Sequence, residues 1–283
     1  MSDRLSVLPQ YLLPKKALTS FGAHIAGARA GGATTRLIRW FVNKYGVDMS
    51  EAADPDIASY ASFNDFFTRA LKPGARPLAD ATLISPVDGA ISQFGAIDDD
   101  QIFQAKGHRY STTALVGGDA QLAAHFAHGH FATLYLSPRD YHRIHMPCAG
   151  RLRRMIYVPG DLFSVNPTTA RGVPGLFARN ERVVCVFEGA HGPFVQVLVG
   201  ATIVGSMATV WQGALNPLQR AREVREWTYA DGEVTLAQGE EMGRFLLGST
   251  VVMLFPRGPL RFNPEWAPGR SIRLGEAMAW RDA

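Results

Sequence analysis

Ser249-Thr250-Val251-Val252-Met253-Leu254-Phe255 is the stretch that decides the fold, because a short apolar run rich in β-branched residues is typical of a buried strand. Similar runs occur at 132–136, 183–187, 195–199 and 201–205, with Gly- and Pro-rich turns between them. They are too short for buried helices. From about residue 80 onward the sequence therefore predicts a mostly antiparallel β core, similar to a sandwich or barrel.

Residues 1–72 have a helical period instead. The apolar residues of 18–25 fall on one helix face, and those of 37–45 do the same. We expect short amphipathic helices here and the β-rich core at 73–283. The predicted fold class is therefore α+β.

Capping residues indicate where these helices begin and end. Thr34 or Thr35 is expected as the N-cap of the second helix, and Gly46 as its C-cap. Ser62, followed by Asp65, indicates a capping box that opens a third helix.

Basic charge is concentrated at one end of the chain. Residues 1–46 hold seven Lys or Arg against one Asp, a net charge of +6, and the whole chain of 283 residues carries +4, which leaves −2 for residues 47–283. This distribution argues against a nucleic-acid-binding surface and favours a local docking segment. Two alternatives remain open for the helical faces. Either these faces bind an anionic membrane surface, which Trp40 and Tyr45 would suit, or the faces pack on the protein's own core.

The sequence also limits the compartment. No apolar run approaches the ~20 residues that span a bilayer, and the first nine residues lack the basic and unbroken apolar regions of a secretion signal. Two cysteines, Cys148 and Cys185, are too few for a disulfide framework. We therefore expect a chain that is neither secreted nor transmembrane.

Ser249 is also a candidate for chemistry. A serine that attacks an external substrate usually lies in a Gly-x-Ser-x-Gly turn before a helix, whereas Ser249 follows Leu247-Gly248 and opens a strand. Glycine adds no bulk beside the carbonyl of Gly248, so the Ser249 hydroxyl is suited to attack its own preceding peptide bond. The structural alternative is a β-bulge at the start of a strand.

Six longer motifs follow one another along the chain. They are Ser85–Gly89, Gln104–His108, Tyr135–Cys148, Val158–Asn166, Phe177–Arg182 and Leu247–Thr250. With these motifs in this order, the chain resembles the phosphatidylserine decarboxylase proenzymes of bacteria from its first twenty residues to about residue 260. No motif marks residues 265–283.

The resemblance implies a precursor that cuts itself between Gly248 and Ser249. The products would be a large subunit, residues 1–248, and a small subunit, residues 249–283. The two would stay together as a heterodimer because the first strand of the small subunit is part of the sheet, and the heterodimer could dimerise further.

Self-cleavage needs an oxygen nucleophile, a base, and a carboxylate that holds the base in the useful tautomer. Ser249, His145 and Asp88 would supply these three. The amide would rearrange to an ester, and β-elimination would then expel the Gly248 carboxylate. Hydrolysis of the resulting dehydroalanine would leave an N-terminal pyruvoyl group and ammonia.

This pyruvoyl group, derived from Ser249, is the expected cofactor, with no metal and no pyridoxal phosphate. It would form a Schiff base with phosphatidylserine and accept the electron pair when carbon dioxide leaves, which gives phosphatidylethanolamine. His142 is the first candidate for reprotonating the substrate carbon, before His145, and Ser164 is a candidate for contacting the headgroup. The resemblance also implies a peripheral enzyme at the cytoplasmic face of the inner membrane, on an anionic surface that contains its substrate.

Other interpretations remain open. Asp88-Gly89 could form an ordinary turn. The spacing of His142, His145 and Cys148 could suggest zinc, although no second pair of ligands stands out. The chain could also be a serine hydrolase that uses Asp88, His145 and Ser249 without cutting itself, or a lipid-binding module.

Overall fold

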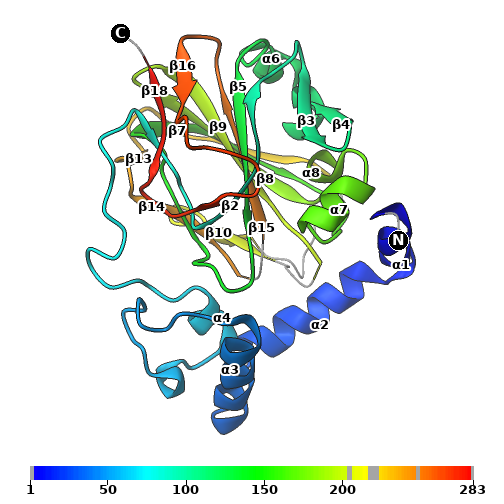
Figure 1. The fold of residues 1–283 in the computed structure, drawn as a ribbon, viewed down its shortest axis with the longest axis vertical. Coiled ribbons are helices and arrows are strands. Elements are labelled where there is room, and N and C mark those ends of the chain that lie inside the picture. The colour runs from blue at the N-terminus through cyan, green and yellow to red at the C-terminus, as the bar shows by residue number, and fades with distance from the viewer. Residues whose placement is uncertain (1–2, 203–205, 216–222, 247–248, 282–283) are drawn as a thin grey trace.

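A large antiparallel sheet forms the centre of the computed structural model (Figure 1). The structure describes residues 3–202, 206–215, 223–246 and 249–281. The strands of the sheet follow the order β12 (Arg225–Thr228), β7 (Gly150–Val158), β8 (Arg182–Gly189), β9 (Gly192–Val199), β15 (Ser249–Phe255), β5 (His130–Leu136), β2 (Gly89–Ala96) and β17 (Ser271–Ile272), and β13 (Thr235–Leu236) also pairs with β7.

Smaller elements surround this sheet. One four-stranded sheet has the order β11 (Gly213–Leu215), β10 (Met207–Thr209), β14 (Glu241–Phe245) and β6 (Arg143–His145). A three-stranded sheet has the order β1 (Leu83–Ile84), β18 (Ala277–Arg281) and β16 (Leu260–Phe262), and β3 (Gln101–Ala105) pairs with β4 (His108–Ser111). The short helices of this part are α5 (Thr112–Leu115), α6 (Ala120–Ala124), α7 (Pro167–Gly172) and α8 (Leu176–Arg179).

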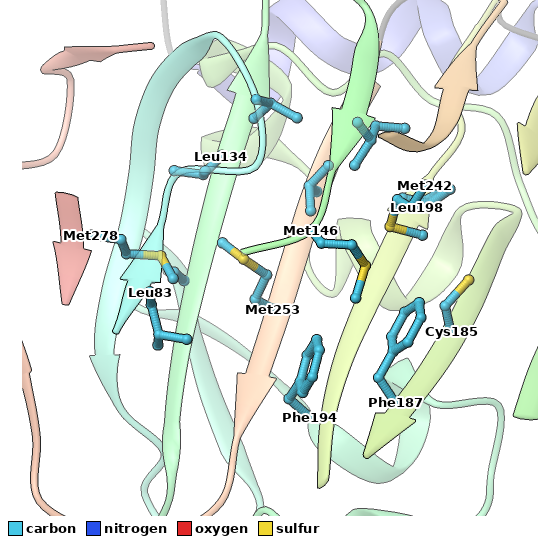
Figure 2. Packing of buried hydrophobic residues seen from close by; sticks show 14 of the residues in the cluster. Leu83, Leu134, Met146, Cys185, Phe187, Phe194, Leu198, Met242, Met253 and Met278 are labelled. Carbon is cyan, nitrogen blue, oxygen red and sulfur yellow. The ribbon is translucent and has the colours of Figure 1, made fainter. Parts of the chain in front are cut away.

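The central sheet has a hydrophobic layer on each face, because side chains alternate along a strand. Val251 and Met253 of β15 belong to one buried cluster, which includes Met242 of the four-stranded sheet and which Figure 2 shows in part. Val252 and Leu254 belong to a second cluster, together with residues of α5–α8, β3 and β4. The α+β class and the mostly antiparallel core are confirmed. The described strands end at β12 and β17 and do not close into a barrel.

The antiparallel order brings several chain segments to one end of the central sheet. Ser249, the first residue of β15, is paired with Leu136, the last residue of β5. Thr250 is paired with Val199, the last residue of β9. β2 begins at the same end, since Ala90 pairs with Tyr135, and β7 ends where β8 begins. The predicted strand at 201–205 lies partly outside the described residues.

The N-terminal segment contains α1 (Asp3–Leu12), α2 (Lys15–Gly27), α3 (Gly32–Tyr45), a 3₁₀ turn (Ile57–Ser59) and α4 (Phe63–Phe67). Figure 1 shows α2, α3 and α4 beyond the end of the central sheet at which β15 begins. In the described part of the chain, no helix is long and apolar enough to cross a membrane.

The two predicted amphipathic faces differ in what covers them. Ile38 and Phe41 of α3 are buried in a cluster with the phenylalanines of α4, as the core-packing alternative predicts. The face of α2 is exposed instead. Leu18 and Ile25 are partly accessible, and the Phe21 side chain is 66% exposed.

The predicted caps are confirmed in part. Gly46 ends α3 in the left-handed conformation, with φ 65°, and Ser62 accepts a hydrogen bond from the Asp65 N–H to open α4. The prediction of Thr34 or Thr35 as N-cap of α3 is wrong, because the helix begins earlier, after Gly31. Thr34 accepts from the N–H of Ala30 at 3.1 Å and so stabilises the turn before the helix.

Candidate functional site

The backbone of Ser249 lies at the start of an internal strand of the central sheet, between β5 and β9. Leu247, Gly248 and the Ser249 side chain lie outside what the structure describes. The hydroxyl of the next residue, Thr250, is buried and has no hydrogen-bond partner among the described residues.

Asp88 lies just before β2, two strands away from Ser249 across β5. Neighbouring strands are about 4.8 Å apart, so these two backbones are separated by roughly 10 Å. The next residue after Asp88 is glycine because β2 begins so close to β5 that a Cβ at residue 89 would lie 2.3 Å from the carbonyl oxygen of Tyr135. Asp88-Gly89 therefore starts a strand rather than forming an isolated turn.

The Asp88 carboxylate is held by an arginine. Arg76 donates to it through Nε at 2.9 Å and through Nη2 at 2.5 Å, and the N–H of Leu274 donates at 2.8 Å. Arg76 also pairs with Glu51 at 2.7 Å. These hydrogen bonds raise the pKa of Arg76 and lower that of Glu51.

His145 lies in β6 with both ring nitrogens bonded. Nδ1 is 2.8 Å from the carbonyl oxygen of Gly239, and Nε2 is 3.1 Å from the hydroxyl of Tyr141. A carbonyl can only accept, so Nδ1 carries the proton and the Tyr141 hydroxyl donates to Nε2. Burial lowers the pKa of His145, and the more distant charge of Asp88 raises it slightly.

Asp88 and His145 are neighbours, but they are not directly bonded in this structure. The backbone N–H of His145 donates to Pro86, two residues before Asp88, at 2.9 Å. The position beside Nδ1 that the expected carboxylate would take is filled by the carbonyl of Gly239. Gly239 has φ 78°, in a turn that ends just before β14. In the sequence, the only sign of this turn is the glycine that follows Gln238.

His142 lies beside the last residue of β14, and His145 lies beside its first. The carbonyl of His142 accepts from the N–H of Phe245, at the end of β14, whereas His145 pairs with the start of that strand. The imidazole is completely buried against the ring of Phe67, with the ring centroids 4.0 Å apart. Nδ1 donates to the carbonyl of Asp140 at 2.8 Å, and Nε2 has no partner among the described residues. Burial lowers the pKa of His142 to about 3, so the ring is neutral and Nε2 is a free proton acceptor.

Ser164 lies in the loop after β7, at the same end of the central sheet. Its N–H donates to the side-chain oxygen of Gln10, in α1, at 2.9 Å. The preceding residue, Phe163, is joined to the end of β9 because the Asn180 amide donates to the carbonyls of both Phe163 and Gly200 at 2.8 Å. The fold therefore brings this loop to the site, although its sequence gives no sign of the contact with α1.

Three residues beside the candidate site are not predicted from the sequence. Tyr141 and Arg76 bond to His145 and Asp88, respectively, and the charge of Arg69 acts on His142. Tyr141 lies within the Tyr135–Cys148 motif, which is the signal that could have identified it. Arg69 and Arg76 have no such signal, because nothing local distinguishes them from other arginines. Among the residues that the structure describes, no group of three or more His, Cys, Asp or Glu side chains is placed to hold a metal ion.

Neutral imidazoles at His142 and His145 can accept and return protons, and this is what a site of acid–base chemistry requires. Comparison with known proteins identifies the family. A family model described as phosphatidylserine decarboxylase matches residues 63–279, and one described as PSD matches residues 5–46.

Three relatives are similar over nearly the whole chain. The phosphatidylserine decarboxylase proenzyme of Polaromonas naphthalenivorans (strain CJ2) is 77% identical over 282 residues, which cover 99% of this chain and 97% of the relative. The proenzyme of Azoarcus sp. (strain BH72) is 76% identical, covering 98% and 96%. That of Variovorax paradoxus (strain S110) is 77% identical, covering 99% and 98%. The chain belongs to the phosphatidylserine decarboxylase family.

Proposed function

We propose that this chain is a phosphatidylserine decarboxylase precursor that cuts itself between Gly248 and Ser249. The observation that carries the proposal is the match to proenzymes over 99% of the chain. The position of Ser249 in the sheet supports it. A small subunit, 249–283, would keep its β15 hydrogen bonds to β5 and β9 after the cut and so stay bound to the large subunit, 1–248.

In the proposed cleavage the Ser249 hydroxyl oxygen bonds to the carbonyl carbon of Gly248 and the amide C–N bond breaks. His145 receives the hydroxyl proton at Nε2 and returns it to the new amine, which leaves an ester. Removal of the Ser249 α-proton then expels the Gly248 carboxylate, and hydrolysis of the dehydroalanine releases ammonia. Burial lowers the pKa of His145, whereas the carbonyl of Gly239 and the charge of Glu241 raise it. Asp88 adds a smaller contribution in that upward direction, so Asp88 would help to stabilise the charged imidazole through space.

The residues around position 249 fit the pyruvoyl group that this sequence of steps leaves. The Thr250 hydroxyl and His142 Nε2 are both buried without a partner among the described residues, so this end of the sheet contains unused hydrogen-bonding groups. When present, the group supplies an electron sink for the pair left by carbon dioxide. The substrate carbon needs one proton when carbon dioxide leaves, and His142 would pass this proton from solvent to the carbon through Nε2. Ser164 would contact the headgroup.

We also propose that the N-terminal helices dock on an anionic membrane at its cytoplasmic face. The exposed face of α2, around Phe21, is apolar. On α3, Arg36, Arg39 and Trp40 are exposed together, and the Lys44 ammonium lies 4.6 Å from the centroid of the Trp40 ring. A face of exposed apolar side chains beside basic and aromatic ones suits a lipid headgroup layer.

Denaturing mass spectrometry tests the proposal. We expect two fragments, the shorter one beginning at residue 249 with a carbonyl in place of the amine. The Ser249→Ala chain should stay intact and should not decarboxylate phosphatidylserine. An intact, fully active wild-type chain that reacts with a serine-directed reagent would instead identify a serine hydrolase.

A further inference from the structure

Arg69, just after α4, is a buried arginine whose hydrogen-bonding groups are mostly unused. Only 4% of the surface of this residue is exposed. Nη2 donates to the carbonyl of Arg139 at 3.3 Å, which is a long hydrogen bond, and Nε and Nη1 have no acceptor among the described residues. Burial lowers the pKa of Arg69. A buried guanidinium with unmet donors is strongly unfavourable, so its presence requires an explanation.

The carboxylates around Arg69 are already engaged. Asp88 accepts from Arg76, and Asp140 accepts from both the N–H and the hydroxyl of Ser137 at 2.7 Å. Two more carboxylates of this region also have partners, since Asp48 accepts from Ser50 and Glu51 pairs with Arg76 and Arg273. Among the described residues, no carboxylate lies within ion-pair distance of Arg69.

Arg69 lines a cavity of about 420 Å³ that adjoins the candidate site. Asp88, Gly89 and Tyr141 line the same cavity, and the positive charge of Arg69 contributes to the low pKa of His142. A guanidinium presents its N–H groups as a planar fork that matches the oxygens of a phosphate. Four carboxylates, each with a partner, line this cavity as well, and three of them pair with its other three arginines. Among the described lining residues, Arg69 is therefore the arginine that no carboxylate neutralises.

We propose that Arg69 and this cavity bind the phosphodiester of the substrate headgroup. The identity of the substrate rests on the proposed function. In phosphatidylserine only a few bonds separate the phosphorus from the amine, so a phosphate subsite has to adjoin the reacting position, as this cavity does. The same donors would also suit free phosphate, and the test separates the two sources.

Glycerophosphocholine is a suitable probe, because it has the phosphodiester but its quaternary ammonium cannot condense with a carbonyl. We would titrate it against the full processed protein and follow the broadening of its ³¹P signal. Arg69→Ala should weaken binding by about tenfold or more, since a hydrogen bond to a charged group is lost. Arg69→Lys keeps the charge but loses the fork, and we expect a smaller loss, of at least about threefold. Arg109→Ala is the control, because Arg109 does not line this cavity, is 48% exposed and pairs with Asp98, and this variant should bind the probe as the wild type does.

Thermal unfolding of each variant checks that it is folded. If Arg69→Ala does not fold, Arg69→Lys decides the question. Equal binding of the probe by wild type and Arg69→Lys would overturn the proposal, and so would absence of binding by the wild type. Tighter binding of inorganic phosphate than of the phosphodiester would also overturn it and would identify a free-phosphate site. The same titration on Ser249→Ala needs neither self-cleavage nor decarboxylation, so its outcome is independent of the proposed reaction.

Discussion

The Tyr141 hydroxyl donates to Nε2 of His145, 3.1 Å away, on the side of the ring opposite its bond to Gly239. A hydroxyl and a backbone carbonyl therefore hold this imidazole in its neutral, Nδ1-protonated tautomer. Burial raises the pKa of Tyr141 to about 12, so the hydroxyl keeps its proton at neutral pH. In the proposed cleavage Nε2 of His145 accepts the proton of the Ser249 hydroxyl. The Tyr141 hydroxyl therefore has to give up its bond to Nε2 before the proton is transferred.

Tyr141→Phe should move the acid limb of the self-cleavage pH profile to higher pH. The tyrosine stabilises the neutral imidazole by donating to Nε2, so its removal raises the pKa of His145, and the base is then neutral only at higher pH. The rate at which precursor disappears, measured across pH, checks this. Tyr110→Phe is the matched control, because Tyr110 is buried in the other hydrophobic cluster. An acid limb at the same pH in Tyr141→Phe and wild type would contradict the assignment.

The sequence predicts the local features of this protein better than its long-range contacts. The strand at 249–255, the C-cap at Gly46 and the N-cap at Ser62 depend on residue types that are close together in the chain. α1 was not expected as a helix, and Pro9 lies within it. The exposed face of α2 was recognised as apolar, but its exposure depends on which other elements pack there.

The hydrogen-bond partners of the site residues are the part of the site that the sequence does not predict. The family resemblance and the chemistry together point to Asp88 and His145, and the fold does bring them to neighbouring positions. The partners of Asp88 are Arg76 and Leu274, and the partner of His145 Nδ1 is the carbonyl of Gly239. A backbone carbonyl has no side-chain signature, so no sequence pattern distinguishes it from a carboxylate that could do the same work.

Gln10→Ala should raise KM for phosphatidylserine in vesicles and leave self-cleavage unchanged. Gln10 joins α1 to the Ser164 loop, since it accepts from the Ser164 N–H and donates to the Thr169 hydroxyl at 3.1 Å. Two hydrogen bonds worth about 1 kcal/mol each are lost, so the rise should be at most about thirtyfold. Leu12→Ala is the matched control on the same helix, because Leu12 is 90% exposed. Vesicle sedimentation should show weaker vesicle binding for Leu12→Ala and unchanged vesicle binding for Gln10→Ala. Identical behaviour of the two variants would show that Gln10 has no separate role.

Phe21→Ser should weaken binding to anionic vesicles by roughly ten- to a hundredfold, because an exposed phenylalanine gains about 1.5–3 kcal/mol when it is buried in the lipid. Arg39→Gln should weaken it by about 1 kcal/mol at low salt and by less at high salt. Vesicle sedimentation at two salt concentrations measures both effects. Ile38→Ser is the control, because Ile38 is buried in the protein and its loss should lower stability without changing vesicle affinity in the folded fraction. Full vesicle binding by Phe21→Ser would remove α2 from the docking surface.

Gly89→Ala should destabilise the protein by about 1–3 kcal/mol, the usual cost of overpacking, because the added Cβ would lie 2.3 Å from the carbonyl oxygen of Tyr135. The backbone must shift to relieve this contact, and Asp88 moves with it. Thermal unfolding and the rate of self-cleavage measure the two effects. Gly32→Ala is the control, since a Cβ there meets nothing within 4 Å, and it should be neutral or stabilising. Equal stability of the two variants would show that the strand pair adapts to the methyl group.

His142 should make the stability of the fold depend on pH below about 6.5, the ordinary pKa of an unfolded histidine. Burial lowers its pKa in the folded state to about 3. As pH falls between these two values, the unfolded chain takes up a proton that the folded chain does not, so the free energy of unfolding decreases by up to about 1.4 kcal/mol per pH unit. His142→Asn lacks this titration. Urea unfolding of Ser249→Ala, with and without His142→Asn, measures this at pH 7, 6 and 5. As pH falls, the chain with asparagine should become more stable relative to the chain with histidine. A stability difference that stays constant would mean that the buried imidazole is protonated as easily as an exposed one.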